Sequence, residues 1–144
     1  PVEVRWVEAD LSSWVPHGQF DLVTTHYAHP AIPQLEFYER LAGWVAPGGT
    51  LLIVGHLHTP AQHHGDHDHS GHAHDNRPPE HASVTAAAVA AILDPAQWDI
   101  VTTDEVTRSL PDRRGGSVQL NDVVVRATRR RPSRDAQTSD KAPS

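Results

Sequence analysis

Polar and aromatic side chains follow three apolar segments of the sequence, close to the point where each segment ends. They are Asp10, His26, Tyr27, His29, His56 and His58. In open α/β sheets, ligands bind beyond the carboxyl ends of the parallel strands. If the three segments are strands of one such sheet, these side chains lie along the same edge. The pattern therefore predicts a ligand-binding cleft, while each residue alone also suits a structural role in a turn or at a strand end.

A second group of possible ligands is the histidine-rich segment 56–81. Its histidines alternate with aspartates and glycines, as in His67-Asp68-His69. Imidazoles and carboxylates bind Zn²⁺, Ni²⁺ and Cu²⁺, but this spacing does not define one tetrahedral site, and ordering such a loop around an ion costs conformational entropy. We interpret residues 57–81 as a loop insertion with adventitious affinity for divalent metal. A metal-binding module is the alternative function.

Hydrophobic patterning predicts a strand at each of the three segments. Residues 2–7 alternate apolar and polar side chains, and residues 20–26 are rich in β-branched and aromatic ones. Residues 50–56 are almost continuously apolar, which is typical of a strand that is buried on both faces by helices. The core is expected to include Phe37, Leu41, Trp44, Leu52, Ile53 and Val54.

Two helices are predicted between these strands and after them. Pro33 fits a first helical turn, and the apolar stripe that follows it, through Trp44 and Val45, ends at the Pro-Gly-Gly of residues 47–49. A strand, a helix and a strand in this order form a right-handed crossover. Thr85 can cap a second helix that runs to Leu93.

The last part of the chain is predicted to form a hairpin. Residues 98–106 and 120–128 have strand patterning, and the turn-rich connection 111–116 is too short for a crossover helix, so the two strands should pair antiparallel. Residues 132–144 are rich in Pro, Ser, Asp and Lys and are predicted to be a disordered tail after a domain of residues 1–131.

Composition limits the class of protein. The chain has 144 residues, of which 38% are hydrophobic and 21% charged, as in one globular domain. Its apolar runs are shorter than the ~20 residues that cross a bilayer, and it opens without a leader, which predicts a cytoplasmic protein. With no cysteine, thiolate chemistry is excluded. A net charge of −6 disfavours nucleic acid as a partner, and the basic residues of 126–134 suit a solvated terminus.

Three motifs, in this order and at this spacing, resemble strands of a known family. The motifs are Val-Glu-Ala-Asp-Leu at 7–11, Phe-Asp-Leu-Val at 20–23 and Trp-Val-Ala-Pro-Gly-Gly-Thr-Leu-Leu-Ile-Val at 44–54. They resemble the third, fourth and fifth strands of class I S-adenosylmethionine-dependent methyltransferases. Val-Gly-His at 54–56 and the strand 121–127 are similar to the tellurite-resistance-type branch in actinobacteria. The resemblance covers residues 1–131.

The resemblance implies a fold, a reaction and site residues. The fold would be a three-layer, Rossmann-like α/β domain whose sheet is mostly parallel, with an antiparallel carboxyl-terminal hairpin. The enzyme would move a methyl group from S-adenosyl-L-methionine to a small-molecule acceptor. Asp10 would accept a hydrogen bond from the adenine amino group, Leu11 would pack on the adenine, His26 would line the methionine portion, and Tyr27 would lie beside the methyl group. His26 and His29 are the candidate catalytic bases.

The sequence also departs from this family. This sequence has no counterpart of three features of the family: the first strand, the glycine-rich turn and the acidic residue that binds the ribose hydroxyls. No Asp-Pro-Pro-Tyr-type motif follows Val23, which disfavours a nucleic-acid base as the acceptor. Because residue 1 is a proline that opens directly on strand patterning, we expect the chain to be a carboxyl-terminal fragment that lacks the amino-terminal strands.

Overall fold

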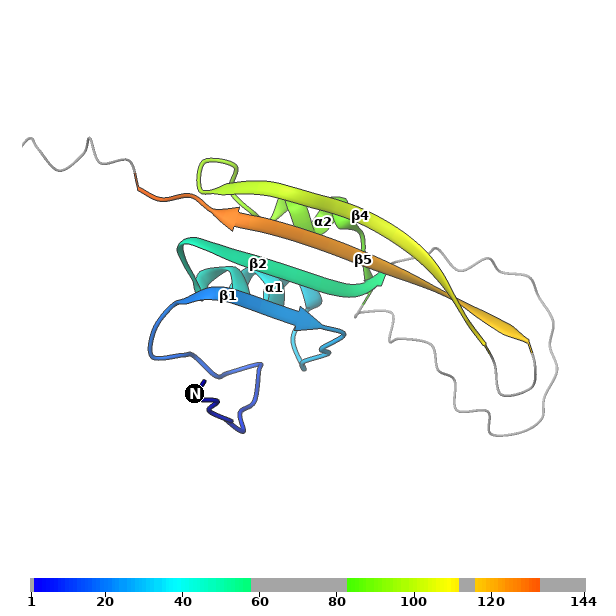
Figure 1. The fold of residues 1–144 in the computed structure, drawn as a ribbon, viewed down its shortest axis with the longest axis horizontal. Helices are drawn as coiled ribbons and strands as arrows, with labels where there is room; N and C mark the ends of the chain where they lie inside the picture. The colour runs from blue at the N-terminus through cyan, green and yellow to red at the C-terminus, as the bar shows by residue number, and fades with distance from the viewer. Residues whose placement is uncertain (1, 58–82, 112–115, 133–144) are drawn as a thin grey trace, which may run out of the picture.

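The structure is a computed structural model that describes residues 2–57, 83–111 and 116–132. In these residues one sheet has the strand order β1-β2-β5-β4, with a short fifth strand, β3, paired to the end of β2 (Figure 1). The strands are β1 (Phe20–His26), β2 (Val45–Leu57), β3 (Ser83–Val84), β4 (Trp98–Pro111) and β5 (Ser117–Arg129), and the helices are α1 (Gln34–Gly43) and α2 (Ala86–Ala91).

The sheet is mixed and mostly antiparallel, so the prediction of a mostly parallel sheet was wrong. Strands β1 and β3 pair parallel to β2, but β3 has only 2 residues. Strand β5 pairs antiparallel to both β2 and β4. Because β4 and β5 are 14 and 13 residues long, the predicted hairpin is present but extends well beyond its expected bounds and forms the longest ladder of the sheet.

Residues 2–7 do not form the predicted strand. They have no regular secondary structure, and Val2 and Trp6 are 93% and 91% exposed. A strand needs a neighbour for its backbone N–H and C=O groups. In the described residues β1 is the end of the sheet, and it pairs only with β2, so this alternating segment has no strand beside it.

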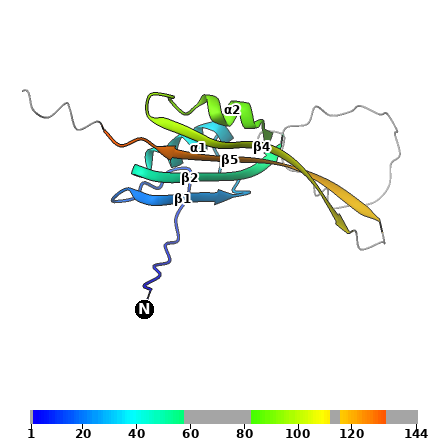
Figure 2. The same cartoon turned by 45° about the horizontal axis from the view of Figure 1, so that its top comes forward.

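Both helices lie on the same face of the sheet, so the described residues form two layers rather than the predicted three (Figure 2). Helix α1 contributes Phe37, Tyr38 and Leu41 to a single core, and α2 contributes Val89. These side chains pack on the inward residues of β2 and β5. The described residues supply no helix for the second face, where Leu22 is 59% exposed.

Strand β2 shows the effect of this one-sided cover. Leu51 and Ile53 are fully buried beneath the helices, whereas Leu52 and Val54 alternate with them on the other face and are only half-buried. The expectation of burial on both faces was therefore wrong. Trp44 is also half-buried, while Phe37, Leu41 and Ile53 belong to the core as predicted.

Several local predictions are confirmed by the structure. Strand β1 has the expected bounds, and α1 begins after Pro33. Thr85 caps α2, since its hydroxyl accepts a hydrogen bond of 3.1 Å from the Ala88 N–H. Val45, by contrast, begins β2 instead of ending the helix. The chain there turns through Gly48, whose positive φ of 88° suits glycine.

No helix in the described part of the chain is long and apolar enough to span a membrane. The histidine-rich segment, apart from His56 and Leu57, lies outside the described residues, as do the turn residues 112–115 and the predicted tail from residue 133.

We expect Ile53→Ala to lower the free energy of unfolding by about 2–5 kcal/mol, because it deletes a fully buried side chain and leaves a cavity. Leu52→Ala should cost about 1 kcal/mol, since its side chain is partly exposed on the uncovered face. Urea denaturation followed by circular dichroism measures both. Equal losses for the two variants would contradict a core on one face.

Candidate functional site

The parallel strands β1 and β2 end side by side, and the chain leaving β1 turns sharply at Tyr27. The Tyr27 N–H donates a hydrogen bond of 2.9 Å to the carbonyl of Val54, which keeps this residue beside β2. Tyr27 has a φ of 54°, which is uncommon for a residue other than glycine. Such strained residues are concentrated at functional sites, so this turn is a first indication of where the site lies.

Three aromatic rings gather at this point. The ring centroids of Tyr27 and His56 are 5.0 Å apart, and those of His29 and His56 are 5.2 Å apart with an interplanar angle of 17°. His56 therefore lies between the chain that leaves β1 and the neighbouring strand β5. The structure thus brings together predicted edge residues from two separate segments of the sequence.

The hairpin adds two charged residues to this cluster. Arg108 of β4 donates through Nε to Oδ2 of Asp122 on β5, and its Nη2 donates to the Tyr27 hydroxyl at 3.1 Å. The guanidinium carbon also lies 5.7 Å from the centre of the Tyr27 ring. Asp122 is the direct register partner of His56 in the β2–β5 ladder. We call Tyr27, His29, His56, Arg108 and Asp122 the edge cluster.

Alternation along β5 decides on which face the edge cluster lies. Val123 and Val125 are fully buried beneath the helices, so Asp122 points to the opposite face. This is the face that no helix of the described residues covers, and Asp122 lies there at the carboxyl ends of β1 and β2. Polar groups therefore occupy the edge of the sheet at which the sequence predicted a ligand cleft.

Asp122 is the most unusual member of the edge cluster. The residue is 4% exposed, yet its Oδ1 atom has no hydrogen-bond partner in the described residues. Most buried polar atoms in proteins have a partner, because an unpaired one loses its hydration without compensation. The Arg108 guanidinium balances the charge through Oδ2 alone.

The environment changes three pKa values in the edge cluster. Burial, followed by the charge of His29, lowers the pKa of His56 from its ordinary 6.5. Burial and the nearby Asp122 raise the pKa of the Tyr27 hydroxyl. The hydrogen bond to Asp122 raises the pKa of Arg108. At neutral pH the cluster thus combines a neutral imidazole, a protonated phenol and an arginine–carboxylate ion pair.

The other predicted site residues lie near this edge but outside the cluster. His26 is exposed, and its Nε2 lies 2.9 Å from the Thr24 hydroxyl. Asp10 and Leu11 are exposed in a turn, where the Asp10 carboxylate accepts a hydrogen bond of 2.8 Å from the Ser12 N–H. This bond lowers the pKa of Asp10. The turn is joined to the chain after β1, since the Ser12 hydroxyl accepts a bond of 3.1 Å from the Ala31 N–H.

Arg108 and Asp122 were missed by the sequence analysis. The signal for Asp122 is a lone carboxylate that directly precedes three valines. Arg108 gives no such signal, because its role depends on the register that pairs β4 with β5.

No group of three or more metal-binding side chains is present in the described ranges. The alternative function, a metal-binding module, depends on residues 58–81. These residues lie outside those ranges.

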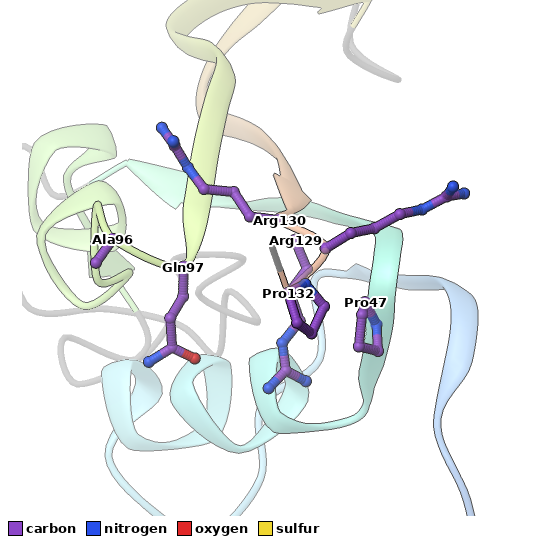
Figure 3. Close-up of a pocket in the computed structure, with 7 residues that line it drawn as sticks. Pro47, Ala96, Gln97, Arg129, Arg130 and Pro132 are labelled. Atoms are coloured by element: carbon purple, nitrogen blue, oxygen red, sulfur yellow. The ribbon is translucent and has the colours of Figure 1, made fainter. Parts of the chain in front are cut away.

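A hollow lined by arginines lies at the other end of the sheet and does not form a convergent site (Figure 3). Arg130 reaches towards Asp99 of β4, at 2.5 Å, and Arg129 towards the carbonyl of Val45, at 2.6 Å. Their guanidinium groups point in different directions and are both engaged. A further hollow is lined by Trp14 and Phe20, near the start of β1.

No family model and no curated protein matches the chain. The crystal structure of TehB from Haemophilus influenzae matches with a TM-score of 0.52 and 11% identity over 81% of this chain and 37% of that one. A structure from work on the conversion of a disulfide bond into a thioacetal group during echinomycin biosynthesis matches with a TM-score of 0.48 and 16% identity, over 88% of this chain and 55% of that one.

At the level of the fold, the similarity to TehB confirms the resemblance that the sequence motifs indicate. The described residues share part of the fold of TehB. The chain spans 37% of the TehB chain and 55% of the other.

We expect the shifted pKa of His56 to affect stability on the acid side. Folding favours the neutral imidazole, so this contribution is complete above pH 6.5 and is lost as the pH falls through the lower pKa of the folded state. His56→Gln should therefore lose less stability than the parent between neutral pH and pH 5. Urea midpoints at several pH values measure this, with the exposed His26→Gln as the control. Parallel curves for all three proteins would refute the shift.

Proposed function

We propose that this chain forms part of a methyltransferase that transfers a methyl group from S-adenosyl-L-methionine to a small-molecule acceptor. The observation that carries the proposal is the edge cluster itself. It lies at the carboxyl ends of the parallel strands of a methyltransferase-like sheet, where ligands of such sheets bind. The cluster also contains a buried carboxylate oxygen without a hydrogen-bond partner among the described residues, which a purely structural site has no need to keep.

The described residues fit one part of the cofactor. Asp10 presents an exposed carboxylate that suits the adenine amino group, and the exposed Leu11 offers an apolar surface for the ring. His26 and Tyr27 stand at the end of β1, where the methionine portion would lie. The cofactor supplies an activated methyl group on a sulfonium. No glycine-rich turn or ribose-binding carboxylate is present in the sequence, so residues 1–144 supply only part of a cofactor site.

The edge cluster suits the acceptor side of the reaction. A sulfonium already carries a good leaving group, so the main task of the protein is to hold the nucleophile in line with the methyl group. Tyr27 has a protonated hydroxyl, and its ring is fixed by Arg108. The rings of Tyr27, His29 and His56 offer flat surfaces against which a small acceptor could be oriented.

We expect S-adenosylhomocysteine to bind this chain weakly. Where the gene encodes residues ahead of Pro1, the longer protein should bind it more tightly, because those residues would complete the cofactor site. Calorimetric titration into both forms measures the affinity. Absence of binding by either form, together with stoichiometric uptake of zinc, would replace the proposal with the metal-binding alternative.

We expect Asp10→Ala to weaken this binding by about tenfold, because a hydrogen bond between a charged group and the adenine contributes about 1.5 kcal/mol. Its stability should hardly change, since Asp10 is exposed. Asp21→Ala, at another exposed carboxylate, is the matched control. Unchanged affinity in Asp10→Ala would remove this residue from the cofactor site.

A further inference from the structure

We propose that His56 and Asp122 form an imidazole–carboxylate dyad in which His56 is the general base for a hydroxyl-bearing acceptor and Asp122 positions and stabilises it. The inference rests on the proposed function, because a base at this place has a use only if a nucleophile reacts there. It differs from the sequence-based candidates, His26 and His29, which lie on the chain around the end of β1.

The first argument is placement. His56 and Asp122 are direct partners in the ladder between β2 and β5, and both strands are fixed by fully buried neighbours. Directly opposite residues of an antiparallel pair have Cβ atoms about 4.5–5.5 Å apart. The imidazole and the carboxylate are therefore close enough to form a hydrogen bond through a side-chain rotation.

The second argument is the unpartnered oxygen. Arg108 bonds to Oδ2 of Asp122, while Oδ1 is enclosed and unbonded. Because this atom is shielded from solvent, its partner must be one of the side chains that enclose it. Two of these side chains can donate to it: the Tyr27 hydroxyl, which accepts from Arg108 and keeps its own O–H, and His56, which has N–H donors on both ring nitrogens once it has gained a proton. Oδ1 is thus a free acceptor at the place where a protonated imidazole needs one.

The third argument is the charge balance around His56. His29 stacks on it from the chain after β1, Arg108 faces it from β4, and Asp122 faces it from β5. Burial, His29 and Arg108 favour the neutral ring, and Asp122 favours the protonated ring. A general base must be neutral before the reaction and stabilised after it gains the proton, and these neighbours provide for both states.

The dyad indicates the class of acceptor. A nucleophile with a free lone pair, such as a thioether, needs no base, whereas a hydroxyl must lose a proton. In the transfer, the hydroxyl oxygen forms the bond to the methyl carbon, the carbon–sulfur bond breaks with its electron pair on sulfur, and the hydroxyl proton moves to His56. The charge of the new imidazolium is balanced by Asp122.

The dyad can be tested in this chain without the cofactor, through the imidazole titrations in ¹H–¹³C NMR spectra. The His56 signal is assigned by its absence in His56→Gln. Asp122→Asn should lower the pKa of His56 by about one unit, because the stabilising charge is lost. Arg108→Gln should raise it, since the opposing charge is removed. Asp104→Asn, at an exposed carboxylate of the same hairpin, should leave it unchanged.

Either of two results would overturn the dyad. One is a His56 titration that is the same in Asp122→Asn as in the parent. The other is a His56 titration that Arg108→Gln leaves in place or moves downwards. Arg108 is the more exposed partner of the ion pair, so its variant keeps the test decisive if Asp122→Asn does not fold.

The acceptor class is tested with phenol and anisole, in which a methyl group replaces the hydroxyl proton. Both probes should shift the Tyr27 ring signals in NMR titrations. Phenol should reach half-saturation at about one-fifth of the concentration that anisole needs, because phenol forms one additional hydrogen bond. The preference should vanish in His56→Gln and persist in His17→Gln, at an exposed histidine ahead of β1. Equal binding of the two probes would refute the hydroxyl class. The proposed function would instead be refuted if neither this chain nor a longer form bound S-adenosylhomocysteine. Failure of the dyad and failure of the proposed function can therefore be told apart.

Discussion

The position of β2 between β1 and β5 is the constraint on which the rest of the structure depends. Its inward residues, among them Leu51 and Ile53, are the fully buried centre of the core. Its two ladders run in different directions, parallel to β1 and antiparallel to β5. Because of this arrangement, the end of β1, the end of β2 and the middle of the hairpin meet at one edge of the sheet.

The edge cluster follows from that meeting. The carbonyl of Val54 holds the Tyr27 backbone, and the register of β2 with β5 sets His56 opposite Asp122. A buried carboxylate is costly unless it is paired, and Arg108 satisfies only one of its oxygens. The sheet therefore keeps, within the edge cluster, a buried carboxylate oxygen that has no hydrogen-bond partner in the described residues.

Local features of the fold could be predicted from the sequence because they depend on neighbouring residues. Examples are the bounds of β1, the start of α1 after Pro33, the cap at Thr85 and the antiparallel hairpin. The strands predicted from the motifs of residues 20–23 and 44–54 are also present, in a fold that is similar to part of TehB.

The features that depend on distant partners could not be predicted in this way. The alternation of residues 2–7 suits a strand, but no neighbour in the described residues pairs with it. The apolar run of β2 suggested two covered faces, and its second face has no helix in the described residues. Arg108 and Asp122 lie 14 residues apart, so only the register of the hairpin shows that they meet beside Tyr27 and His56.

The most direct test of the proposed site is ¹⁵N–¹H NMR of the longest form of the protein that its gene encodes, titrated with S-adenosylhomocysteine. We expect the amide signals of Asp10, Tyr27 and His56 to shift together, with those of Gly49 and Arg129 at the opposite end of the sheet unchanged. Shifts confined to that opposite end, or no shift at saturating ligand, would contradict a cofactor site at the carboxyl edge.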